Sequence, residues 1–174
     1  MRDAERKRRF DALAHQYADD LFRFAVWLCR DHALAGDLVQ ETFVRAWRGL
    51  DGLKDVDAAK SWLITILRRE YARTFERKVP PMCDVDDVVV ADEGELGPEE
   101  RAERDALRSA MLELDANYRE PLLLQVVMGL SIAEIAAQLE LTESATMTRV
   151  FRAREKLRAR LRPADRDDNV HEIG

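Results

Sequence analysis

The sequence is poor in the residues from which metal, cofactor and catalytic sites are built. Its 174 residues include only two cysteines, Cys29 and Cys83, and three scattered histidines. Their spacing matches no metal-ligand set, and the sequence contains no nucleophile–base pair and no glycine-rich phosphate loop. We therefore predict that the protein is not an enzyme, that no residue is catalytic or binds a metal, and that no cofactor or small-molecule substrate is used.

Long hydrophobic runs are absent as well. No stretch approaches the roughly 18 apolar residues of a membrane-spanning helix, and the basic residues 6–9 are not followed by the apolar core of a signal peptide. The two cysteines form no C-x-x-C motif, and thiols of this kind are typical of a reducing compartment. These features predict a cytoplasmic protein.

Glycine and proline, with 7 and 5 residues, cluster outside the segments in which apolar residues recur regularly. Within those segments the apolar residues are three or four positions apart, which is the period of an amphipathic helix. The residues Leu13, Tyr17, Leu21, Phe24 and Leu28 are one such series. The fold class predicted is all-α, with two small helical domains joined by an acidic flexible linker.

Acidic charge is concentrated in two segments. Residues 79–105 hold 2 Lys or Arg against 10 Asp or Glu, and residues 163–174 hold 1 against 4. The blocks 1–78 and 106–162 are mildly basic, with 16 against 13 and 9 against 7. We predict an N-terminal domain over 1–78, an extended or disordered linker over 79–105, a C-terminal domain over 106–162 and an acidic tail over 163–174. The net charge of -6 therefore does not exclude nucleic-acid binding by the two domains.

The segment from Ser131 to Glu155 has the pattern of a helix-turn-helix. Ser131 and Glu134 have the spacing of a capping box at the start of a first helix, and Thr142 is an N-cap candidate for a second helix. Two adjacent alanines in the first helix permit a close helix crossing. Glu140 occupies a turn position where glycine is usual, and a left-handed conformation there costs about 1 kcal/mol relative to glycine.

The second of these helices is expected to have a buried face and a DNA-binding face. Its apolar face would consist of Thr146, Val150, Ala153 and Leu157. Arginine, threonine and apolar side chains on an exposed helix can contact guanine edges, phosphates and thymine methyl groups in a major groove. An ordinary helical hairpin with a solvated basic face is the alternative interpretation. The residues predicted to contact DNA are Met147, Thr148, Arg149, Phe151 and Arg152.

In the first block, Asp37, Gln40 and Glu41 share one helix face at i, i+3 and i+4. Taken alone, this patch is better explained as a simply solvated polar face. However, the sequence DLVQETF at 37–43, followed by AW at 46–47 and KSWLITI at 60–66, resembles the first conserved domain of bacterial extracytoplasmic-function (ECF) sigma factors. The helix-turn-helix that ends in FRAR at 151–154 resembles their second domain. The resemblance covers about 10–78 and 106–162.

This resemblance implies a role for each region. A sigma factor binds core RNA polymerase, recognises the −10 and −35 promoter elements and starts transcription, here of a stress or envelope regulon. Asp37, Gln40 and Glu41 match the positions that dock on core polymerase, and the outward face of the recognition helix would read the −35 element. For Trp62, core packing is as good an interpretation as DNA stacking. The residues expected to engage the −10 element are Lys60, Trp62, Arg68, Arg69 and Arg73.

The partners implied are core RNA polymerase, promoter DNA and an anti-sigma protein. A second hypothesis remains open from the sequence: a stand-alone helix-turn-helix regulator that binds operator DNA without polymerase. Such a regulator would protect duplex DNA by itself, whereas a sigma factor would do so as part of the polymerase.

Overall fold

The computed structural model describes residues 3–77 and 97–162, which form helices and short connections with no strand among them. Most of the predicted linker, Cys83 and the acidic tail lie outside these residues. The helices in chain order are α1 (Asp3–Cys29), α2 (His32–Gly49), the short 3-10 helix η1 (Leu50–Gly52), α3 (Ala59–Arg77), α4 (Pro98–Leu112), α5 (Ala116–Val126), α6 (Ile132–Leu139) and α7 (Glu143–Leu161). The predicted all-α fold is confirmed.

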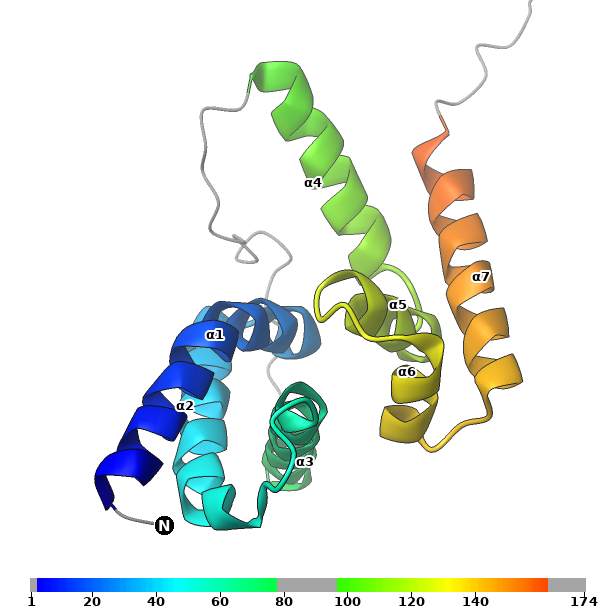
Figure 1. Cartoon of the computed structure of the whole chain (residues 1–174). Coiled ribbons are helices and arrows are strands. Elements are labelled where there is room, and N and C mark those ends of the chain that lie inside the picture. The colour runs from blue at the N-terminus through cyan, green and yellow to red at the C-terminus, as the bar shows by residue number, and fades with distance from the viewer. Residues whose placement is uncertain (1–2, 78–96, 163–174) are drawn as a thin grey trace, which may run out of the picture.

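The first three helices pack against one another as the N-terminal domain (Figure 1). The chain reverses between α1 and α2 at Arg30, which adopts a left-handed conformation with φ 55°. Asp31 then caps α2, because its carboxylate accepts a hydrogen bond of 2.8 Å from the backbone N–H of Leu34. Phe24, Leu63 and other large apolar side chains from the three helices are fully buried between them. The N-terminal core therefore fixes the orientation of α2 and α3.

Helices α4 to α7 form the C-terminal domain around Leu124, Met128, Ile135 and Val150, all of which are buried. In the view of Figure 1, α5 and α6 lie between α3 and α7. Helix α5 contacts α1, and α6 contacts α3. The two domains are thus in direct contact, through α5 and α6 on the C-terminal side.

Helix α4 begins earlier than the sequence suggested. Residues 98–105, which were assigned to an extended linker, form its first turns. Pro98 occupies the first helical position of α4, where its missing N–H and fixed φ are favourable. The Glu100 carboxylate also accepts a hydrogen bond of 3.1 Å from the backbone N–H of Gly97. These signals start a helix, so the expectation of an extended or disordered chain was wrong for residues 98–105.

Candidate nucleic-acid and protein interfaces

The helix-turn-helix begins with the predicted capping box. The backbone N–H of Ser131 donates to the Glu134 carboxylate at 2.7 Å, and the backbone N–H of Glu134 donates to the Ser131 hydroxyl at 3.3 Å. The hydrogen bond from the Ser131 backbone, followed by that from its hydroxyl, lowers the pKa of Glu134 below its ordinary value of 4.5. Because the pKa is lowered on folding, this cap stabilises the helix above about pH 4.5 and is lost as the pH falls through the lower folded pKa.

The turn between α6 and α7 also has the predicted geometry. Glu140 adopts a left-handed conformation, with φ 54° and ψ 44°. This conformation lets the backbone N–H of Leu141 donate back to the carbonyl of Ala136 at 2.9 Å, which closes the end of α6. Thr142 then caps α7, since its hydroxyl accepts a hydrogen bond of 3.1 Å from the backbone N–H of Ala145. The two helices are therefore joined as the sequence indicated.

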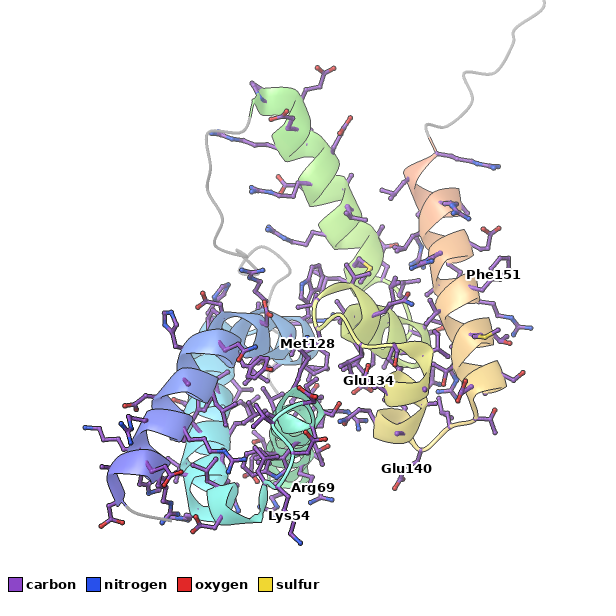
Figure 2. All side chains as sticks on the ribbon, viewed as in Figure 1. Lys54, Arg69, Met128, Glu134, Glu140 and Phe151 are labelled. Carbon is purple, nitrogen blue, oxygen red and sulfur yellow. The ribbon has the colours of Figure 1, made fainter. Side chains whose placement is uncertain are left out.

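Helix α7 has one buried face and one open face. Thr146, Val150, Ala153 and Leu157 are buried against the rest of the C-terminal domain, as predicted. On the opposite face Met147 is 56% exposed and Phe151 is 64% exposed. Figure 2 shows Phe151 on the side of α7 that faces away from α5 and α6. Thr148 and Arg152 are exposed too, and Arg149 is half-buried.

The open face of α7 borders a concave surface. Thr148, Arg149 and Arg152 line a cavity of about 690 Å³ together with residues 115–118 at the start of α5 and Ala145. The first backbone N–H groups of a helix carry no intrahelical partner and favour anions. The cavity therefore places two arginine side chains beside the start of a second helix, an arrangement suited to a phosphate backbone.

The predicted docking residues Asp37, Gln40 and Glu41 line a groove of about 620 Å³ between α2 and α3. Asp37 and Gln40 are exposed, whereas Glu41 accepts an ion pair of 2.9 Å from Arg45. Leu34, Leu38 and Val44 add apolar surface to the same groove. The groove therefore combines acidic and apolar side chains along one helix.

Arg73 lies in this groove and not with the other predicted −10 residues. Its guanidinium contacts the Glu70 carboxylate at 2.8 Å, and Arg45 contacts the same carboxylate at 2.7 Å. Glu70 is only 7% exposed, so it acts as a nearly buried acid shared by two arginines. Glu70 was not predicted, although it continues the buried stripe of Leu63 and Leu67 at helical spacing.

The remaining cationic residues predicted for the −10 element face the C-terminal domain. The Lys60 ammonium donates to the carbonyl of Met128 at 3.0 Å. Arg68 forms an ion pair of 2.6 Å with Glu120 and donates to the carbonyl of Gln138. Arg69 is exposed and lines a cavity of about 900 Å³ between the domains.

Trp62 is half-buried and packs against the N-terminal core. Its ring lies so close to Gly49 that a Cβ atom placed there would be 3.3 Å from the ring. The residues predicted for the −10 element thus do not form one continuous surface. One lies in the groove between α2 and α3, three face the C-terminal domain, and Trp62 packs against the N-terminal core.

Tyr71 of α3 holds the C-terminal end of α1 in place. Its hydroxyl donates to the carbonyl of Leu28 at 2.8 Å. Burial, followed by the nearby Cys29, raises the pKa of Tyr71 to about 12. Because the pKa is raised on folding, the neutral phenol stabilises the fold fully below its ordinary pKa of 10, and this stabilisation is lost as the pH rises through about 12.

Within residues 3–77 and 97–162, no group of three or more His, Cys, Asp or Glu side chains is placed to hold a metal ion. No helix in the same ranges has both the length and the apolar character needed to cross a membrane.

Both halves of the chain match known protein families. Sigma-70 region 2 matches residues 13–79, and Sigma-70, region 4 matches residues 104–157. The ECF RNA polymerase sigma factor EcfG of Rhodopseudomonas palustris is 31% identical over 139 residues, which cover 79% of this chain and 77% of EcfG. The chain is an ECF sigma factor of the sigma-70 family.

Other ECF sigma factors give the same result over most of the chain. The ECF RNA polymerase sigma factor SigM of Bacillus subtilis is 29% identical over 152 residues, which cover 86% of this chain and 93% of SigM. The sigma factor RpoE of Bartonella quintana, solved in complex with the anti-sigma factor NepR, superposes with a TM-score of 0.70 at 28% identity. That likeness covers 90% of this chain and 98% of RpoE, so it spans both domains.

The family decides between the two hypotheses drawn from the sequence. The protein is an RNA polymerase sigma factor, and the stand-alone regulator is not supported. Sigma factors are regulatory rather than catalytic proteins.

Proposed function

We propose that this sigma factor divides its contacts among three surfaces. The groove between α2 and α3 docks on core RNA polymerase, the open face of α7 reads the −35 element, and cationic residues of α3 contact the −10 element. Our domain assignment follows this division: an N-terminal unit for polymerase and the −10 element, and a C-terminal unit for the −35 element. The observation that carries the proposal is the open face of α7, on a helix whose other face is buried.

The chemistry of the open α7 face suits a major groove. Arg152 offers forked N–H donors to a guanine edge, and Met147 and Phe151 offer apolar contact to thymine methyl groups. Large apolar side chains exposed next to arginines are poorly explained by solvation alone. Arg149 lies beside the start of α5 and suits a phosphate contact that fixes the orientation of the domain.

The groove between α2 and α3 suits a helical segment of a larger protein. Its acidic residues favour basic side chains, and Leu34 and Val44 provide the apolar surface that a partner helix would cover. Glu70 supports the groove because it holds Arg45 and Arg73 in place on either side. Docking here would leave the open face of α7 accessible to DNA.

An anti-sigma protein is part of the proposal. RpoE of Bartonella quintana is bound by an anti-sigma factor, and its likeness to this chain extends over both domains. We therefore propose that an anti-sigma protein captures this sigma factor in the cytoplasm. Its release would start transcription of a stress or envelope regulon.

The docking surface can be tested with the double variant Gln40→Ala, Glu41→Ala. Both side chains line the groove, and loss of two polar contacts of about 1 kcal/mol each weakens binding to core polymerase by about tenfold or more. The measurement is the affinity for core polymerase in a pull-down or titration, followed by run-off transcription from a promoter transcribed by the wild-type holoenzyme.

The matched control is Gln16→Ala, Glu5→Ala, which removes the same two side-chain types from exposed positions on α1. The control should bind like the wild type, and circular dichroism should show an unchanged fold for both variants. Wild-type affinity of the groove variant would refute the docking surface.

A further inference from the structure

A buried carboxylate lines the groove between α2 and α3. Among the charged side chains that the structure describes, Glu70 alone is buried, with 7% of its surface exposed. Its carboxylate accepts a hydrogen bond of 2.8 Å from Arg73, three residues later on the same helix. A buried carboxylate needs a cationic partner, and Arg73 supplies one within α3. The contact between Glu70 and Arg45 of α2 is therefore an additional ion pair.

Arg45 is shared between two carboxylates. Its Nε atom lies 2.7 Å from Glu70 and 2.9 Å from Glu41, which precedes Arg45 by one helical turn. This nitrogen is buried, and within the described residues it makes no hydrogen bond of normal geometry. Nε carries a single hydrogen, which points at only one acceptor at a time, and a misaligned hydrogen bond is weak. Arg45 therefore lies between two alternative pairings, one with each acid.

The two acids differ in what can reach them. The side chain of Glu41 is 43% exposed, so a cation of another protein can approach it, whereas Glu70 is enclosed by α2 and α3. Glu41 is also one of the residues proposed to dock on core polymerase. A basic side chain of the polymerase that approaches Glu41 meets a carboxylate already in contact with Arg45, and the two cations repel each other. Docking on Glu41 is easier if Arg45 has another acceptor within reach.

We propose that Glu70 is a positioning residue for polymerase docking. When a cation of core polymerase binds Glu41, the Arg45 guanidinium moves fully onto Glu70, so that no charge in the groove loses its partner. Glu70 thus acts through Arg45 and does not touch the polymerase. The inference rests on the proposed docking role of the groove, and it makes Arg45 an internal competitor for the docking carboxylate.

The test is a set of titrations of core polymerase with the full-length chain. Arg45→Met removes the guanidinium but keeps a long side chain, and it should tighten binding by about two- to fivefold, the range expected for one partly exposed ion pair. Glu70→Gln keeps the size of the side chain and should weaken binding by about the same factor. In the Arg45→Met background Glu70→Gln should have no effect, since no guanidinium remains to be moved.

This dependence on Arg45 separates positioning from support of the fold. If Glu70→Gln merely loosened the packing of α2 on α3, it would weaken binding equally in both backgrounds, and that result would overturn the proposal. If the gain in Arg45→Met came only from removal of positive charge, it would persist in a Glu41→Gln background, where we expect none. Failure of Arg45→Met to tighten binding in the otherwise wild-type chain would also contradict the proposal.

The matched control is Arg23→Met. Arg23 forms an ion pair of 3.7 Å with Asp20 on α1, outside the groove, so the same substitution there should leave the affinity unchanged. Urea unfolding followed by circular dichroism checks the stability of each variant. If Glu70→Gln is unstable, Glu70→Asp replaces it, because it keeps the charge but has a shorter reach and should weaken binding in the same Arg45-dependent way.

Glu41→Gln alone separates this inference from the proposed function. If the Glu41→Gln variant binds core polymerase like the wild type, the docking role of Glu41 falls. If it binds more weakly while the effects of Arg45→Met and Glu70→Gln simply add, the docking role stands and only the role of Glu70 falls.

Discussion

Helices α3 and α7 share a pattern of buried and cationic faces and differ in what contacts the cationic face. Each has one face in a domain core and another rich in cationic residues. On α7 that face is open, and Phe151 projects from it (Figure 2). On α3 the same type of face is met by carbonyl and carboxylate oxygens of the C-terminal domain. An arginine-rich helix face is therefore a candidate binding surface only where no other domain already satisfies its donors.

The two helices differ in which cationic side chains already have partners. The proposed −35 surface on α7 is open, whereas Lys60 and Arg68 on α3 contact the Met128 carbonyl and the Glu120 carboxylate of the C-terminal domain. Three experiments bear on this contrast, two of them on α7 itself and one on the turn that links it to the contact with α3.

The largest expected effect concerns the two faces of α7. Leu157→Ala should lower the free energy of unfolding by about 2–5 kcal/mol, because it leaves a cavity under a buried leucine. Phe151→Ala, six residues earlier on the open face, should change the same free energy by no more than about 0.5 kcal/mol. Urea unfolding followed by circular dichroism measures both. A comparable loss in the Phe151 variant would show that the outward face is packed in solution.

A smaller effect is expected from Arg152→Ala, which should weaken binding to a −35 duplex by about 1–3 kcal/mol. Since α7 takes no part in the contacts that Glu120 and Gln138 make with α3, the loss should be the same in the wild type and in the Gln138→Ala, Glu120→Ala variant. Anisotropy titrations with duplex DNA measure the two losses. Unequal losses would mean that contact between the domains also affects α7, and an equal loss on scrambled duplex would assign Arg152 to phosphate.

The smallest effect is expected at the turn that connects α6, which contacts α3, with α7. Glu140→Gly should raise the free energy of unfolding by up to about 1 kcal/mol, because glycine tolerates φ 54° without a Cβ clash. The measurement is thermal or urea unfolding. Duplex affinity should stay unchanged, as Glu140 lies outside the open face of α7. A loss of stability would indicate that its side chain contributes more than its conformation costs.

Much of the helix-turn-helix could be predicted because its signals are local. Ser131, Glu134 and Thr142 form their caps within three residues of sequence, and the left-handed Glu140 follows from the shortness of the turn. The inward and outward faces of α7 follow from helical period alone. These features depend on neighbours along the chain, which the sequence displays directly.

The start of α4 shows a different kind of failure. Residues 98–105 were assigned to the linker, although Pro98 stands at the first helical position, where proline begins a helix. A Gly-Pro pair can follow the end of one helix or precede the start of the next, and the pair alone does not tell the two cases apart. Residues 98–105 carry too few apolar side chains to settle the choice from their spacing.

The surroundings of α3 could not be predicted, because they depend on residues distant in sequence. Helical period separates Arg73 from Arg68 by more than a turn, but it does not reveal that Arg73 lines the groove beside α2 whereas Arg68 donates to α6. The partner of Lys60 is a carbonyl 68 residues away, and main-chain acceptors carry no signature in the sequence. The cationic residues of α3 could therefore be identified from the sequence, but the groups that they contact could not.

The use of main-chain carbonyls at Leu112, Met128 and Gln138 affects how mutation acts on the molecule. A carbonyl persists whichever amino acid occupies the position, so substitutions there alter the surroundings of the oxygen without removing it. Point changes in the C-terminal half can therefore loosen the association of the two halves but do not readily erase it. Substitutions that abolish the association outright should instead affect the donor side chains, which are Arg30, Lys60 and Arg68.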